Sequence, residues 1–176
     1  PVGGGMGGGS SNAATVLVAL NHLWHTSLTQ EKLIELGKTL GADVPFFIYG
    51  KNAFATGIGD EFTSISLPDL HFILIEPNFS ISTKKIFTNL NISPSFINAK
   101  SIKADYLLQT KDNDLESVAV KLYPELKNII KNLSAYGNPR MTGSGSVFYL
   151  SFLDSESAKK VAHLLKNRYN PLLVKS

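Results

Sequence analysis

The stretch that most constrains this chain is its glycine-rich opening, Pro1-Val2-Gly3-Gly4-Gly5-Met6-Gly7-Gly8-Gly9-Ser10-Ser11-Asn12. It leads directly into a segment with apolar residues at positions 13, 16, 17, 20, 23 and 24, the spacing of a helix with one buried face. A glycine loop before a helix N-terminus directs several backbone N–H groups, and the positive end of the helix dipole, at one point. The opening therefore predicts an anion site, and phosphate is the usual anion.

Other interpretations of these glycines fit the sequence less well. A flexible linker has a similar composition, but it needs neither Met6 nor an amphipathic helix directly after it. A Walker A loop requires a lysine where Ser10 and Ser11 stand. A dinucleotide fingerprint requires an acid at a strand end, whereas Glu31 lies in a helical pattern, and the protein-kinase loop precedes a strand. The three known phosphate loops fit poorly, and a phosphate loop of another kind is favoured over a linker.

The composition limits the class of protein. With 176 residues, 43% of them hydrophobic and 18% charged, the chain can form one domain, or one and a fraction. It has no cysteine, no apolar run of membrane-spanning length and no signal-peptide pattern, so we expect a cytoplasmic protein without a membrane partner. Because it starts without Met and inside a turn, we also expect the chain to be a fragment.

The charge distribution leaves a further possibility open. Residues 1–62 hold three Lys or Arg against five Asp or Glu, a net charge of −2, so residues 63–176 carry a net charge of +5. A basic half can bind nucleic acid or another polyanion. Its lysines are dispersed along amphipathic patterns, which favours a solvated surface.

Local signals predict the elements that follow the first helix. Thr29 has the position of an N-cap for a second helix, which ends at Gly41. The predicted apolar face of this helix consists of Leu33, Leu36 and Leu40. Residues 52–56 and 61–66 are predicted strands joined by a glycine turn at 57–60.

An acid lies between the second helix and the first strand. In Gly41-Ala42-Asp43-Val44-Pro45-Phe46-Phe47-Ile48, the proline is expected to hold Val44 outside helical geometry. Asp43 is then placed at a rigid bend just past a helix end. Its side chain can act chemically or simply cap the turn.

The remainder predicts a small sheet covered by helices. The expected strands are 71–75, 147–152 and 172–174. The expected helices are 83–90, 115–122, one that starts with Pro124 as its first residue, and one capped by Asp154, with a short helix near 102–108. The order β-α-α-α-β-α-β suits an α+β sandwich.

Two further features are candidate sites. Arg140-Met141-Thr142-Gly143-Ser144-Gly145-Ser146 forms a second glycine turn before a buried strand, and by itself it predicts an ordinary β-turn. His22 and His25 are three residues apart, but no cysteine and no suitably spaced acid accompanies them, so a metal site there is not favoured.

Three motifs together resemble one superfamily. The triple glycines with Ser-Ser-Asn, the Gly-Ala-Asp-Val-Pro segment and the second glycine turn are similar to the galactokinase, homoserine kinase, mevalonate kinase and phosphomevalonate kinase superfamily. Within it they resemble most the branch that phosphorylates 4-diphosphocytidyl-2-C-methyl-D-erythritol in bacterial isoprenoid synthesis by the non-mevalonate pathway.

The resemblance implies an α+β kinase with two domains. Residues 1–62 would be the C-terminal part of the ATP-binding kinase domain, and residues 63–176 a ferredoxin-like α/β sandwich domain. The opening third of the family, which supplies a catalytic lysine and much of the base pockets, has no counterpart here. The chain by itself is therefore expected to be inactive.

The resemblance also implies roles for named residues. Asp43 would be the catalytic carboxylate, and Thr83, Phe87 and Ile58 would bind the cytidine-bearing substrate. The residues implied to bind ATP are Gly3, Gly4, Gly5, Met6, Gly7, Gly8, Gly9, Ser10, Ser11, Asn12, Thr142, Gly143, Ser144 and Gly145. Mg²⁺ would accompany ATP, with its ligand left open.

The implied reaction is ATP-dependent phosphorylation of the 2-hydroxyl of 4-diphosphocytidyl-2-C-methyl-D-erythritol, a small-molecule substrate, with no nucleic-acid partner. A sister kinase acting on homoserine or a mevalonate derivative is the first alternative. A module that binds polyanions without catalysis is the second, although the strand pattern of RNA-binding modules is missing.

Overall fold

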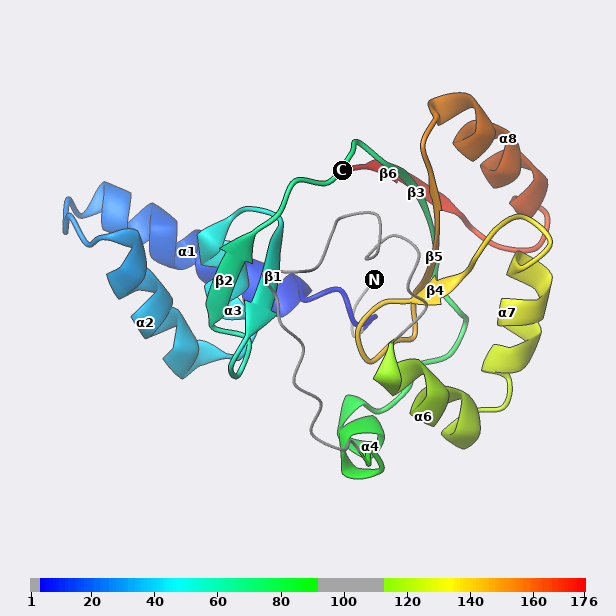
Figure 1. Ribbon diagram of the computed structural model, residues 1–176, viewed down its shortest axis with the longest axis horizontal. Coiled ribbons are helices and arrows are strands. Elements are labelled where there is room, and N and C mark those ends of the chain that lie inside the picture. The colour runs from blue at the N-terminus through cyan, green and yellow to red at the C-terminus, as the bar shows by residue number, and fades with distance from the viewer. Residues whose placement is uncertain (1–3, 92–112) are drawn as a thin grey trace. The chain divides into compact units, whose positions relative to one another are not determined.

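The computed structural model describes residues 4–91 and 113–176, which form two compact units (Figure 1). The helix–hairpin unit contains residues 7–67, and the sheet unit contains the described residues 4–6, 68–91 and 113–176. The helix expected near 102–108 lies outside the described residues. The predicted division of domains between residues 62 and 63 stays a prediction about the intact protein.

The helix–hairpin unit packs three helices beside a two-stranded antiparallel hairpin. Its elements are α1 (Gly8–Leu23), α2 (Gln30–Leu40), α3 (Val44–Tyr49), β1 (Ala53–Thr56) and β2 (Glu61–Ser64). Its buried core consists of Ala14, Leu33, Val44 and Ile48. The predicted cap at Thr29 is confirmed, because the Thr29 hydroxyl accepts a hydrogen bond from the Lys32 N–H at 3.4 Å.

The predicted apolar faces of α1 and α2 are only partly buried. In α1 the one buried residue is Ala14, whereas Leu23 and Trp24 are 67% and 69% exposed. In α2, Leu33 is buried, but Leu36 and Leu40 are exposed. Periodicity marks which side chains share a face of a helix, but the area that neighbouring elements cover decides how many are buried.

The expectation that Val44 is non-helical is wrong. Val44 is the first residue of α3 and Pro45 the second. The first turn of a helix tolerates proline because its missing N–H would have no intrahelical partner there. The restriction on the residue before proline is a preference, and here the burial of Val44, which is 1% exposed, overcomes it.

An ion pair fastens the hairpin to α2. Lys38 Nζ lies 2.5 Å from Asp60 Oδ2, and the hydrogen bond from Lys38 is the main cause that lowers the pKa of Asp60. Because the folded state lowers this pKa, the pair stabilises the unit above the ordinary aspartate value of 3.8, and the contribution is lost as the pH falls below it.

We therefore expect Lys38→Met to lower the thermal midpoint of unfolding slightly at pH 7 and to lower it less at an acidic pH, where Asp60 is increasingly protonated in the folded state as well. Thermal unfolding of both chains at the two pH values measures this. A difference between wild type and variant that is the same at both pH values would contradict a role for the Asp60 charge.

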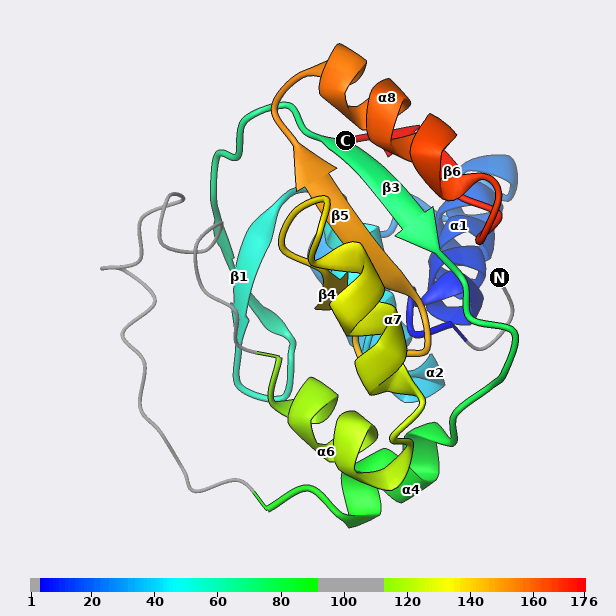
Figure 2. The same cartoon turned by 90° about the vertical axis from the view of Figure 1, so that its right-hand side faces the viewer.

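The sheet unit contains a four-stranded antiparallel sheet in the order β4-β5-β3-β6. Its elements are β3 (His71–Ile75), α4 (Thr83–Thr88), α6 (Asp114–Leu122), α7 (Leu126–Leu133), β4 (Arg140–Met141), β5 (Phe148–Phe152), α8 (Ser155–Leu165) and β6 (Leu172–Lys175). Helices α7 and α8 cover one face of the sheet, as Figures 1 and 2 show. The predicted α+β sandwich is confirmed.

Alternating side chains of the central strand form the core of this unit. Ile73 and Ile75 of β3 are fully buried, and Leu150 of β5 pairs with Ile73 in register. Leu126 and Leu133 of α7 are buried in the same cluster. The unit therefore has its own hydrophobic core.

Two details of the sheet unit differ from the sequence expectation. Arg140 and Met141, expected in a loop, form the short strand β4 beside β5. Pro124 precedes α7 by two residues instead of opening it, and its carbonyl accepts the Lys127 N–H. Within the described residues, no helix is long and apolar enough to cross a membrane.

Candidate functional site

In the sheet unit, the opening glycines contact the second glycine turn. The Thr142 hydroxyl donates to the Gly4 carbonyl at 2.8 Å, and the Val147 N–H approaches the same carbonyl at 3.4 Å. Gly4 and Thr142 are 138 residues apart in sequence. The structure thus brings together two motifs that the sequence suggested only separately.

The two motifs approach so closely that glycine is required on both sides. A Cβ on Gly5 would lie 2.4 Å from the Thr142 carbonyl oxygen, and one on Gly143 would lie 2.8 Å from the Gly5 carbonyl oxygen. Both residues also have positive φ, +73° and +45°. Side chains at either position would separate the loop from the turn.

Two side chains that sequence analysis missed hold this turn. Asn113 Nδ2 donates to the carbonyls of Met141 and Gly143 at 3.0 and 2.8 Å. Glu116 Oε2 accepts the Met141 N–H at 2.9 Å. Asn113 is also the N-cap of α6, and an Asn before an acidic first turn is a recognisable cap signal. No local signal indicated the contact with the turn.

In the helix–hairpin unit, α1 begins with backbone that no side chain caps. Its N-cap, Gly7, has φ +66° and makes no side-chain capping bond. A Cβ on Gly8 or Gly9 would have no heavy atom within 4 Å, so the space there is open. The first turn of this 16-residue helix therefore leaves room beside uncapped N–H donors, which is what an anion requires.

Asp43 lies in the same unit, at the N-cap position of α3. Its side chain makes no capping hydrogen bond and is exposed, so the alternative that it simply caps the turn is wrong. Gly41, two residues earlier, lies beside α1, since a Cβ on it would be 3.9 Å from the Ser10 hydroxyl. Gly7 lies close to Phe47 of α3, because a Cβ on Gly7 would be 2.8 Å from Cε2 of the Phe47 ring. These contacts bring the segment around Asp43 to the start of α1.

The predicted substrate residues divide between the units. Thr83 and Phe87 lie on α4 in the sheet unit, and Ile58 lies in the β1–β2 turn of the helix–hairpin unit, 78% exposed. Phe87 is 56% exposed, so the alternative that it belongs to the core is wrong, and Ile86 is buried in its place. The roles of all three side chains stay predictions.

A cavity of about 490 Å³ in the sheet unit joins two of the predicted sites. Phe87 lines it together with Thr142 and Gly143 of the second glycine turn. Asn113 also lines it. Predicted substrate-binding and phosphate-binding residues thus border one space.

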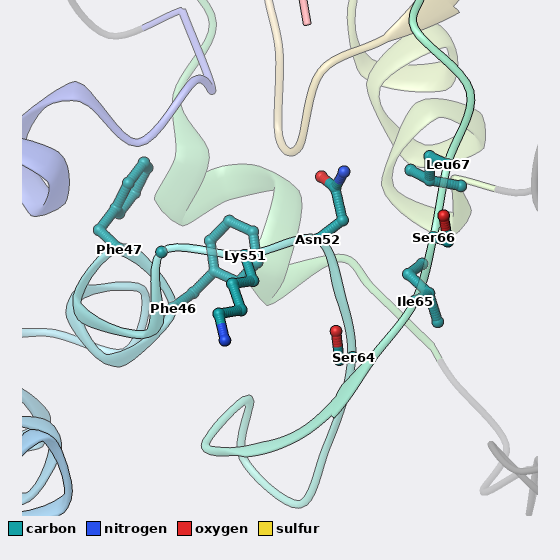
Figure 3. A pocket seen from close by; sticks show the side chains of 9 residues that line it. Phe46, Phe47, Lys51, Asn52, Ser64, Ile65, Ser66 and Leu67 are labelled. Carbon is teal, nitrogen blue, oxygen red and sulfur yellow. The ribbon is translucent and has the colours of Figure 1, made fainter.

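A larger cavity lies elsewhere. In the helix–hairpin unit, an open pocket of about 900 Å³ is lined by Phe46 and Phe47, the segment 50–52 and the segment 64–67 (Figure 3). None of the predicted site residues lines it. The candidate site is therefore defined by the glycine motifs and not by cavity size.

No group of three or more His, Cys, Asp or Glu side chains within residues 4–91 and 113–176 could hold a metal ion. His22 and His25 are both exposed, with ring centroids 6.4 Å apart.

Comparisons with known proteins identify the family. The model of the GHMP kinases N terminal domain matches residues 1–51, and that of the GHMP kinases C terminal region matches residues 99–171. A crystal structure of 4-(cytidine 5'-diphospho)-2C-methyl-D-erythritol kinase matches this chain with 31% sequence identity and a TM-score of 0.81. The match includes 99% of this chain and 67% of that kinase. The chain belongs to the GHMP kinase family.

Two other relatives of this GHMP kinase chain differ in how similar their sequences are to it. The 4-diphosphocytidyl-2-C-methyl-D-erythritol kinase of Mannheimia succiniciproducens is 45% identical over 171 residues, which cover 97% of this chain and 56% of that protein. The chain thus spans little more than half the length of this curated relative. A homoserine kinase structure from Cytophaga hutchinsonii has a TM-score of 0.73 at 17% identity, which shows a shared fold alone.

Proposed function

We propose that a protein carrying this chain transfers the γ-phosphoryl group of ATP to the 2-hydroxyl of 4-diphosphocytidyl-2-C-methyl-D-erythritol. The observation that carries the proposal is the contact of the opening glycines with the turn at 142–145, next to the uncapped start of α1 in sequence. The 45% identity with a kinase named for this substrate supports the choice of acceptor. A cytoplasmic location belongs to the same proposal.

Backbone donors suit this reaction. Phosphoryl transfer requires mainly positioning and neutralisation of charge, and N–H groups without a neighbouring Cβ can approach the phosphates closely. The resemblance implies that residues 3–12, Thr142, Gly143 and Gly145 bind the ATP phosphates. Mg²⁺ bound with ATP would neutralise phosphate charge, and the hydroxyls of Ser10 and Ser11 are the candidate protein ligands.

Asp43 would act on the acceptor. In the transfer, a bond forms between the acceptor oxygen and the γ-phosphorus, the bond from that phosphorus to the bridging oxygen breaks, and ADP leaves. The hydroxyl proton would pass to the Asp43 carboxylate or be oriented by it. The exposed, uncapped state of this side chain supports such a role, because nothing in its own helix engages it.

Phe87 would stack on the cytosine base. Replacing it with alanine is expected to raise the KM for the cytidine substrate about tenfold or more while the KM for ATP stays the same, because base–aromatic stacking contributes about 1–3 kcal/mol. Steady-state kinetics on a protein of the relatives' full length measures both constants.

A matched control for Phe87→Ala is Leu164→Ala, since Leu164 is an apolar residue of α8 with a similar exposure of 53%. It is expected to change neither KM. Equal increases in both constants in Phe87→Ala would indicate general destabilisation and contradict the stacking role.

The test of the proposed function is turnover with alternative acceptors. A full-length protein containing this sequence should phosphorylate the cytidine substrate. It should not phosphorylate homoserine or mevalonate derivatives. Preference for homoserine would favour the first alternative. Salt-dependent binding of polyanions without ATP turnover would favour the non-enzymatic module.

A further inference from the structure

A hydrogen bond links the predicted substrate helix to the second glycine turn. Thr83 Oγ1 and Ser144 Oγ are 2.9 Å apart, and either hydroxyl can be the donor. The residues are 61 positions apart in sequence, and Ser144 is only 7% exposed. Ser144 therefore contacts a predicted substrate residue, although sequence analysis assigned it to phosphate.

The segment before α4 is fixed to the same turn. Ser146 Oγ donates to the Phe79 carbonyl at 3.2 Å, and a Cβ on Gly145 would lie 2.6 Å from Ile81 Cδ1. Ser82 caps α4 by accepting the Lys85 N–H at 3.3 Å. The N-terminus of α4 thus has little freedom relative to the turn.

The rotation of the Thr83 hydroxyl is restricted by its hydrogen bond to Ser144. A threonine on the surface of a short helix can rotate its hydroxyl among several rotamers and directions. A hydrogen bond to Ser144, which is buried in the turn, selects one rotamer of Thr83. It also determines whether the Thr83 hydroxyl presents its proton or a lone pair to a ligand. The pair borders the turn that binds Gly4 through Thr142.

We propose that Ser144 is a positioning residue that orients the Thr83 hydroxyl for the cytidine-bearing substrate. This inference rests on the proposed function and deepens it, because it assigns Ser144 to acceptor recognition. Its contribution is then specific to one substrate: loss of the Ser144 hydroxyl weakens binding of the acceptor and leaves ATP binding unchanged.

The experiment compares Ser144→Ala with Ser146→Ala in the full-length protein. Both remove a buried hydroxyl from the same turn, since Ser146 is 4% exposed, but only Ser144 contacts Thr83. Ser144→Ala is expected to raise the KM for the cytidine substrate on the order of tenfold with the KM for ATP unchanged. Ser146→Ala should show no such difference between the two constants, and Ser144→Thr should restore the acceptor KM.

Thr83→Val provides a second route that does not alter the buried turn. In a double-mutant cycle, adding Ser144→Ala to Thr83→Val is expected to cause no further rise in the acceptor KM. If Ser144→Ala fails to fold, Thr83→Val alone tests whether the Thr83 hydroxyl contributes to the acceptor KM, and an unchanged acceptor KM would overturn the proposal. Additive effects would overturn the proposal, as would an increase in the KM for ATP in Ser144→Ala.

The wild-type protein separates this inference from the function on which it rests. Absence of turnover with the cytidine substrate in wild type would overturn the proposed function. Turnover in wild type, together with equal kinetics of Ser144→Ala and Ser146→Ala, would overturn the positioning role alone.

Discussion

Replacing Gly5 with alanine is expected to destabilise the sheet unit by about 3 kcal/mol. A non-glycine residue in a left-handed conformation costs about 1–2 kcal/mol, and forcing extra volume into a packed site adds about 1–3 kcal/mol. Both apply, because Gly5 has φ +73° and its Cβ would lie 2.4 Å from the Thr142 carbonyl oxygen. Urea unfolding followed by circular dichroism, with hydrogen exchange at residues 4–6 and 142–147, measures the effect.

Gly9→Ala is the matched control for Gly5→Ala. It lies in the first turn of α1, and its Cβ would have no heavy atom within 4 Å, so stability should be unchanged or rise by about 0.5–1 kcal/mol. The same variant should weaken ATP binding, because the methyl group would occupy the space proposed for phosphate. Gly5→Ala with wild-type stability and exchange would contradict the packing of the loop against the turn.

Asp43→Asn is expected to lower turnover of the full-length protein about 10²- to 10⁴-fold, the usual contribution of a positioned acid or base. The amide has the size of the carboxylate but cannot accept the hydroxyl proton. Since Asp43 makes no capping bond and is exposed, the free energy of unfolding should not change. ATP affinity should also be retained, because the residue acts on the acceptor. Turnover, calorimetric ATP binding and thermal unfolding measure the three quantities.

The control for Asp43→Asn is Asp69→Asn, an exposed carboxylate that pairs with Lys175 in the sheet unit. That change removes an equal charge at the surface, and turnover should be unaffected. Near-normal turnover in Asp43→Asn would show that the carboxylate has no role in the chemistry.

Local chemistry in the sequence predicted most of the elements. The Thr29 cap of α2, the glycine turn between β1 and β2 and the apolar strand at 71–75 all appear in the structure. These features depend on residues a few positions apart, so a single sequence contains their causes. The resemblance of the motifs likewise predicted the family that the comparisons show.

Features that depend on a distant partner could not be predicted in this way. Burial overcame the local preference at Val44, and Val16 and Leu23 on the predicted apolar face of α1 are exposed. The two residues of β4 are a strand only because β5 pairs with them. Each outcome depends on what packs against the segment, which local pattern does not specify.

The sequence by itself therefore determined most of the helices, strands and glycine loops, α3 and β4 excepted, since backbone preferences and caps act over a few residues. Only the tertiary structure decided that Gly4 meets Thr142, that Asn113 holds the second turn and that Thr83 meets Ser144. Those contacts join residues that are 30 to 138 positions apart. They arise from the packing of whole elements into one core, a property of the folded chain that local sequence does not specify.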